Sequence, residues 1–139
     1  DHADVDRLMK TAAAVGALPR TMDPDAHDRL MAYLSHLPQL AVSALMQVVG
    51  ERAGSDGLSL AGSGLRDTTR LASSPSGTWR DVTATNAEAL GAAIDDLTAA
   101  LQRLKADLTV GDDLRRIFDE AAKWKRTLDG SDAGGRSEP

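Results

Sequence analysis

LGAAIDDLTAALQRLKADL, from Leu90 to Leu108, is the stretch that decides the fold. Its large apolar residues alternate between spacings of four and three, at Leu90, Ile94, Leu97, Leu101, Leu104 and Leu108. This alternation is an a/d seam, which is typical of a helix packed lengthwise against another helix. The stretch therefore predicts a long helix that starts near Thr85 or Asn86, in an all-α protein.

A last helix is expected after this seam. Thr109 and Asp112 resemble a capping box at its start, with aspartate in place of the usual Glu or Gln. Its inner face would carry Leu114, Ile117, Phe118, Ala121, Trp124 and Leu128. Residues 130–139 are polar and glycine-rich, and this composition predicts a disordered tail.

An earlier helix has a specific start signal, because Asp23 can cap it and Pro24 suits its first position. We expect this helix to run to about Arg52. Pro38 lies in its interior, where a proline kinks a helix or frees a carbonyl group, here near Leu34.

The remaining segments are shorter. Residues 1–15 predict a helix that ends at Gly16, and residues 65–72 predict another. Residues 53–63 are rich in glycine and predict a loop, and SSPSG at 73–77 predicts a break. The result is a bundle of about five or six helices, with more apolar surface than a small monomer covers. A homodimer with helices packed across the two-fold axis would cover it.

The composition agrees with helices and excludes several classes of function. Apolar residues are mainly Ala, Leu and Val, with one Phe, one Tyr and two Trp. A net charge of -5 provides no basic footprint for nucleic acid, so no nucleic-acid partner is expected. The absence of cysteine excludes thiolate sites, and the three histidines lack metal-ligand spacing, so no metal site is expected.

Residues 30–50 contain no Asp, Glu, Lys or Arg over about the length of a membrane span. Several polar side chains interrupt them, which lipid would penalise. We therefore expect a helix buried inside protein and no membrane contact. A polar stripe on this helix, formed by Ser35, His36, Gln39, Ser43 and Gln47, has two interpretations. It forms either an internal hydrogen-bond network or the lining of a pocket for a polar ligand.

A second candidate site is the segment GLRDTTR. Arg66 and Arg70 are four residues apart and would share a helix face, where two guanidinium groups suit a carboxylate or phosphate. Gly62 and Gly64 would let the chain approach a ligand. The alternative is a pair of surface arginines with Asp67 as a salt-bridge partner.

Three other residues have ordinary structural interpretations. Trp79 would be a core or interface anchor, Asn86 a helix cap, and His27 a structural hydrogen-bond partner. No glycine-rich loop between a strand and a helix is present, so no dinucleotide site of that type is expected here.

The motifs together resemble the prephenate and arogenate dehydrogenase family. MDPDAHDRLMAYLSHLPQ (Met22–Gln39) and GLRDTTRLASSPSGTW (Gly64–Trp79) keep the order and spacing of the family's motifs as far as Asn86, with one residue more before Trp79 than in the family. The resemblance implies an all-α, multi-helix bundle similar to the C-terminal domain of 6-phosphogluconate dehydrogenase, which dimerises through long helices. Residues 1–22 would end a nucleotide-binding domain, 23–129 would form the helical dimerisation and substrate domain, and 130–139 the tail.

The same resemblance implies a function for the full-length protein. It would be a cytoplasmic homodimer that uses NAD or NADP, held mainly by an N-terminal domain absent from this chain, to decarboxylate prephenate or arogenate oxidatively in tyrosine biosynthesis. The hydride leaves the ring for the nicotinamide while the ring carboxylate departs as carbon dioxide. No catalytic residue would lie in this chain, which alone would be inactive.

The resemblance also assigns residues to the substrate. Arg70 would bind a substrate carboxylate, with His36 and Gln39 in the same pocket. Ser63 and Gly64 would provide backbone contacts, Trp79 a wall, and Arg66 a possible second cation. Gln39 departs from the family, in which many prephenate-using members have a histidine there, and this admits arogenate as substrate. The alternative is a non-enzymatic helical interaction module that pairs with another protein.

Overall fold

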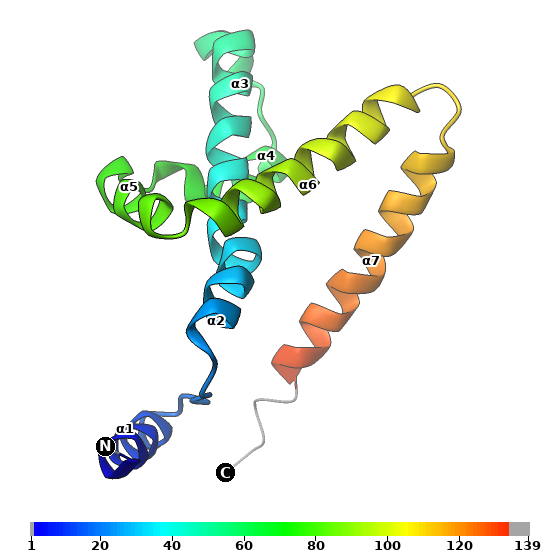
Figure 1. Ribbon diagram of the computed structural model, residues 1–139. Coiled ribbons are helices and arrows are strands. Elements are labelled where there is room, and N and C mark those ends of the chain that lie inside the picture. The colour runs from blue at the N-terminus through cyan, green and yellow to red at the C-terminus, as the bar shows by residue number, and fades with distance from the viewer. Residues whose placement is uncertain (1, 134–139) are drawn as a thin grey trace. The chain divides into compact units, whose positions relative to one another are not determined.

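The computed structural model describes residues 2–133, and every regular element in that range is helical, as predicted (Figure 1). The chain divides into two compact units, residues 1–90 and residues 91–139. The first unit holds the helices that precede the leucine seam and both candidate sites. The second holds most of the leucine seam and the last helix.

The first helix ends, and the second helix begins, where the local signals predict. Helix α1 spans His2–Ala14 and is followed by Gly16, whose φ of 82° is a left-handed conformation that glycine adopts easily. Helix α2 spans Pro24–Met31, and the Asp23 carboxylate caps it by accepting from the Ala26 amide at 3.0 Å. Both predictions are confirmed.

The predicted disturbance near Leu34 takes the form of a π turn. Residues Ala32–His36 form this turn, in which the Leu37 amide donates to the Ala32 carbonyl, and helix α3 follows over Leu37–Ser59. Pro38 has no amide hydrogen for the carbonyl of Leu34, so the wider turn accommodates a missing bond without ending the helix. Figure 1 shows α2 and α3 following one another in one run of helix.

Helix α3 extends further than predicted. It does not end near Arg52, and the loop expected over residues 53–63 is helical as far as Ser59. The glycines nevertheless indicate a local irregularity of the backbone, because Gly54 has a φ of 63° and lies at a kink inside α3. A single left-handed residue changes the direction of the chain, and the helical hydrogen bonding resumes after it.

The next segment has more helix than predicted and a break where none was expected. Helix α4 spans Ser63–Thr68, and a 3-10 turn, η2, spans Arg70–Ser73, so residues 65–72 are not one helix. Thr69 separates the two, and its hydroxyl donates to the Leu65 carbonyl at 2.7 Å, a bond that competes with regular helix. Helix α5, Ser76–Thr85, was not predicted because SSPSG was interpreted as a break only.

Helix α6 spans Ala87–Ala106, and its start confirms the prediction near Asn86. Helix α7 spans Asp112–Ala133, so it starts later than Thr109 and its cap is a different residue. The Asp107 carboxylate accepts from the amides of Gly111 and Leu114, both at 3.2 Å. Because Asp107 reaches these amides across the turn, the capping box expected at Thr109 does not form. Helix α7 also continues through residues 130–133, and the rest of the predicted tail, residues 134–139, lies outside the described residues.

Much of the apolar surface stays uncovered in the single chain. The buried apolar residues of the described range are Ala32, Leu90 and Ala93. On the predicted inner faces, Leu101 of α6 is 56% exposed, and Phe118 and Trp124 of α7 are 66% and 63% exposed. In Figure 1, α6 and α7 diverge from the turn that joins them. Their apolar faces therefore need a further partner surface.

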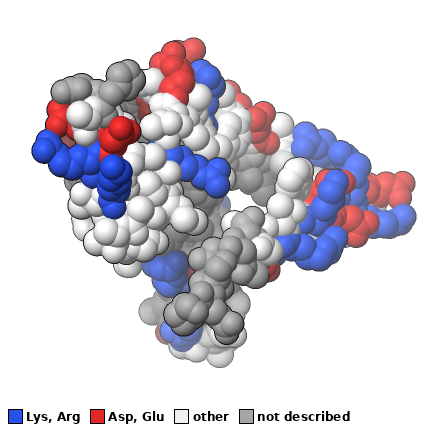
Figure 2. Space-filling view, turned by 90° about the horizontal axis from the view of Figure 1, so that it is seen from below, with Lys and Arg blue, Asp and Glu red and all other residues white. Residues whose placement is uncertain are grey.

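The helical segment over residues 30–50 is also less buried than predicted. Leu34 and Val48 are exposed, and Ala32 and Gln39 are its buried residues, because few elements of the chain pack against α3. Among the described residues, no helix combines the length and the apolar character that crossing a membrane requires. Figure 2 shows acidic and basic side chains side by side on the face it presents.

Candidate functional site

Gln39 is the centre of the first polar cluster. Its side chain is only 4% exposed. Its Nε2 donates to the Leu71 carbonyl at 2.8 Å and to Ser43 Oγ at 3.2 Å, and its Oε1 accepts from Ser74 Oγ at 3.2 Å. Three hydrogen bonds satisfy most of what an amide side chain can form. Gln39 thus ties α3 to the η2 turn and the residue after it.

These bonds match the internal-network interpretation of the polar stripe for Gln39 and Ser43. The other members behave differently: Ser35 is exposed, and Gln47 is exposed and donates to Glu51 on the same helix at 2.9 Å. The polar stripe therefore does not line a single pocket. It divides into a buried clamp around Gln39 and exposed positions on either side.

His36 belongs to a second cluster, formed with α5 and Asn86. The ring of His36 meets the ring of Trp79 edge to face, with centroids 6.1 Å apart and planes at 77°. Asn86 Nδ2 lies 3.4 Å from His36 Nδ1 and donates to the Asp28 carbonyl at 2.8 Å. Both His36 and Trp79 are half-buried, so one side of the imidazole is held and another is open to a ligand.

Arg66 and Arg70 lie on different helical segments, which corrects the prediction that they share one helix face. Arg66 is in α4, and Arg70 is the first residue of η2. Both are exposed, and among the side chains that the structure describes neither forms an ion pair, with Asp67 or with any other carboxylate. Arg70 is adjacent in sequence to Leu71, whose carbonyl Gln39 holds, so its backbone is fixed and its charge is available.

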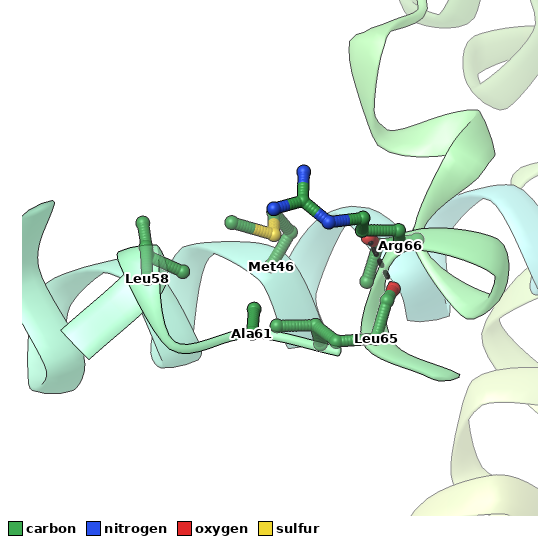
Figure 3. A pocket seen from close by; sticks show the side chains of 6 residues that line it. Met46, Leu58, Ala61, Leu65 and Arg66 are labelled. Atoms are coloured by element: carbon green, nitrogen blue, oxygen red, sulfur yellow. Dashed lines mark hydrogen bonds between the residues drawn. The ribbon is translucent and has the colours of Figure 1, made fainter. Parts of the chain in front are cut away.

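A hollow of about 270 Å³ lies beside Arg66 (Figure 3). Its lining is largely apolar and comes from α3 and the segment after it: Met46, Leu58, Ala61, Leu65, Arg66 and Thr69. Figure 3 shows the guanidinium group of Arg66 beside the Met46 side chain. Arg66 therefore lies at this hollow, and the other predicted substrate residues do not line it.

Ser63 and Gly64 form the start of α4 and are exposed, with Gly62 in the cap position. Of the predicted substrate residues, the structure brings His36 and Trp79 into contact, and it places Gln39 against the turn that Arg70 begins. Ser63, Gly64 and Arg66 lie one segment earlier. Within the described chain, no cluster of three or more histidine or acidic side chains could hold a metal ion.

Sequence reasoning missed the partners that hold the site together. Ser74 and the Leu71 carbonyl hold Gln39, and Asn86 holds His36. Asn86 occupies the predicted cap position before α6, but its side chain bonds to Asp28 and His36 instead of capping. A backbone carbonyl leaves no signal in a sequence, whereas an asparagine between two helices is a signal with more than one meaning.

Comparison with known proteins gives a consistent picture. Residues 23–120 match the model of the family described as "Prephenate dehydrogenase, dimerization domain". The chain is 29% identical over 119 residues to the cyclohexadienyl dehydrogenase of Zymomonas mobilis, which covers 82% of this chain and 41% of that protein. The chain therefore spans about two fifths of the length of this curated relative.

Solved structures agree on the fold. A Corynebacterium glutamicum protein assigned as a prephenate dehydrogenase superposes with a TM-score of 0.78 at 28% identity, over 93% of this chain and 40% of that one. The prephenate dehydrogenase of A. aeolicus, in complex with hydroxyphenyl propionate and NAD+, gives a TM-score of 0.70 at 24% identity, over 96% of this chain and 46% of that one. At that identity the second likeness concerns the fold alone.

Proposed function

Because this chain belongs to the prephenate dehydrogenase family, as its dimerization domain, we propose that it works as the dimerising and substrate-holding part of a cytoplasmic dehydrogenase. The substrate would be prephenate or arogenate, and the reaction an oxidative decarboxylation that uses NAD or NADP. The proposal rests on the family match over residues 23–120. The named relatives, a cyclohexadienyl dehydrogenase and a prephenate dehydrogenase with bound NAD+, support it.

The nucleotide would be held elsewhere than in these helices. The described residues contain no strand and so cannot form the strand–loop–helix unit that cradles a dinucleotide. No histidine or acid of this chain needs to act on the reacting carbon. The described part would contribute binding energy and geometry, with a nucleotide-binding domain completing the active site.

Dimerisation is supported by the apolar faces of α6 and α7. Leu101, Phe118 and Trp124 are more than half exposed, which is costly in water for so many large side chains on two helices. A second copy offers the same faces and can cover them through a two-fold interface. The proposed state is therefore a homodimer.

Substrate holding is supported by the charge of Arg70. This guanidinium is exposed, has no ion-pair partner among the described side chains, and belongs to the first residue of the η2 turn, which Gln39 helps to fix. A carboxylate can accept two parallel hydrogen bonds from it. His36 and Trp79 would form a wall of the same site, with Ser63 and Gly64 nearby in sequence. Arg66 would be a second cation, and Gln39 would hold the turn that Arg70 begins.

Isothermal titration of the dehydrogenase that contains this domain tests the proposal. Arg70→Ala should weaken binding of prephenate or arogenate by about tenfold to a hundredfold, because a hydrogen bond to a charged group contributes about 1.5–3 kcal/mol. Arg52→Ala removes an exposed arginine of α3 and should leave affinity unchanged. Equal affinities of the two variants and the native protein would refute the role of Arg70. Absence of binding by the native protein would refute the proposed function.

A further inference from the structure

Asn86 lies where it can control the chemical state of His36. Its Nδ2 is 2.8 Å from the Asp28 carbonyl oxygen and 3.4 Å from His36 Nδ1. The two contacts join α2, the π turn and the junction of α5 with α6. We propose that Asn86 is a positioning residue that keeps His36 Nδ1 unprotonated and so makes Nε2–H the donor that His36 offers to a ligand.

The first step of the argument is the orientation of the Asn86 amide. A carbonyl oxygen only accepts hydrogen bonds, so the atom of Asn86 that faces the Asp28 carbonyl must be the amide nitrogen. Its other hydrogen then points toward His36. The orientation of this amide follows from the backbone of α2 and does not depend on His36 itself.

The second step concerns the imidazole. An amide nitrogen donates and does not accept, so only a lone pair on Nδ1 can meet it favourably. A neutral imidazole with a free lone pair on Nδ1 carries its hydrogen on Nε2. The edge-to-face contact with Trp79 restricts rotation of the ring, which keeps the two nitrogens from exchanging places.

His27 provides the opposite case in the same chain. Its Nδ1 lies 3.1 Å from a carboxylate oxygen of Asp28, and a carboxylate only accepts. The tautomer of His27 with its hydrogen on Nδ1 is therefore favoured. The two histidines should therefore carry their hydrogens on opposite nitrogens. Asp28 takes part in both cases, because its side chain contacts His27 and its backbone carbonyl orients Asn86.

The consequence for ligand binding rests on the proposed function. A fixed Nε2–H can donate to a carboxylate oxygen of the substrate, whereas an unprotonated Nε2 would repel that oxygen. Asn86 would not touch the substrate. It would set the donor through His36, as residues behind a ligating histidine commonly do.

Nitrogen-15 NMR of the labelled chain tests the inference without any substrate. At about pH 8.5, where histidine side chains are neutral, long-range proton–nitrogen correlations distinguish protonated from unprotonated ring nitrogens. The native spectrum should show His36 with an unprotonated Nδ1 and His27 with a larger Nδ1-protonated fraction. A His36 ring protonated on Nδ1 would overturn the inference by itself.

Two variants sharpen the test. Asn86→Asp replaces the donor with an acceptor and should place a hydrogen on His36 Nδ1, whereas Asp28→Asn should change His27 and leave His36 as in the native protein. If Asn86→Asp folds, as judged by its circular dichroism, and His36 keeps an unprotonated Nδ1, the inference is wrong. If this variant does not fold, the native and Asp28→Asn spectra still decide.

A binding measurement separates this inference from the function on which it rests. In the dehydrogenase at the alkaline pH of the NMR experiment, Asn86→Asp should weaken substrate binding about tenfold, the loss expected for one hydrogen bond to a charged group. An altered tautomer with unaltered affinity would refute the contact between His36 and substrate. An unaltered tautomer refutes the positioning role of Asn86, whatever the substrate is.

Discussion

Replacing Gln39 with glutamate turns one hydrogen-bond donor of the buried clamp into an acceptor, while the shape of the side chain stays the same. In the native chain this side chain is 4% exposed, and its Nε2 donates to the Leu71 carbonyl at 2.8 Å. A carboxylate oxygen in that place would face a carbonyl oxygen. We expect Gln39→Glu to destabilise the first unit at neutral and alkaline pH.

The magnitude follows from two contributions. The Leu71 carbonyl loses its donor, and a buried acceptor without a partner costs about 1–3 kcal/mol. Burying an ionised carboxylate without a cation adds to this cost. The contact of the Ser74 hydroxyl can persist, because that hydroxyl donates to either side chain. The sum is a loss of about 2–4 kcal/mol in the free energy of unfolding.

The loss of stability caused by Gln39→Glu should depend on pH in a defined direction. Burial and the facing carbonyl raise the pKa of the new carboxyl group above that in the unfolded chain. The folded state then binds more protons, so stability falls as the pH rises from the unfolded pKa through the folded one. At low pH the group is protonated in both states, and its hydroxyl can donate to the Leu71 carbonyl. The loss should therefore be large at about pH 8 and small at about pH 4, near the ordinary pKa of glutamate.

Urea unfolding followed by circular dichroism measures this, at one protein concentration because the stability of the proposed homodimer would depend on concentration. Gln47→Glu is the matched control, since it adds the same charge to the same helix at an exposed position. It places a like charge four residues from Glu51, which costs about 0.2–0.5 kcal/mol. Equal losses for the two variants at pH 8, or a difference between them that persists at pH 4, would show that the clamp is not what holds this segment.

Three further perturbations test other parts of the fold. Leu101→Glu should dissociate the proposed homodimer in sedimentation experiments, whereas Gln102→Glu, which adds the same charge outside the leucine seam of α6, should leave it intact. Gly54→Ala should lower stability by about 1 kcal/mol because its φ of 63° strains any side chain, and Gly50→Ala, in regular helix with open space, should raise it by about 0.5–1 kcal/mol in the same thermal unfolding assay. Asp107→Ala removes the cap of α7 and should cost about 0.5–2 kcal/mol in urea unfolding; no loss would show that the cap contributes nothing.

Signals that act within one turn of helix were sufficient to predict several features of the fold. Asp23 and Pro24 begin α2, Gly16 follows α1, and Pro38 disturbs the helix before it. Each of these signals concerns the local backbone, such as a hydrogen bond that the residue itself makes or cannot make. The form of the disturbance, a π turn instead of a bend, was not predictable, because several geometries tolerate one missing amide.

Features that depend on which of several partners a polar side chain bonds to were not predictable in the same way. Thr69 ends α4 through a bond to its own helix, and Asp107 caps α7 in place of Thr109 because the turn brings it there. The partners of Gln39 lie 32 and 35 residues away. A polar residue on an apolar helix indicates that a partner exists, but not whether that partner is protein or ligand.

The hydrogen bonds of Gln39 and those of Asn86 together explain how several of the proposed substrate residues are held in place. Gln39 holds the carbonyl of Leu71, the residue after Arg70, and Asn86 holds His36, which packs against Trp79. The segment from Arg70 to Asn86 is thus fastened to the first helices at both of its ends.

This arrangement separates two roles that Gln39 could have. If Gln39 acts only by holding the turn of Arg70, a substitution there displaces the cation and weakens binding of prephenate and arogenate by the same factor. If its amide also meets the part in which the two substrates differ, the ratio of their affinities must change. The buried and hydrogen-bonded state of the amide favours the first outcome, because a side chain already bonded to Leu71, Ser43 and Ser74 has little left to offer a ligand.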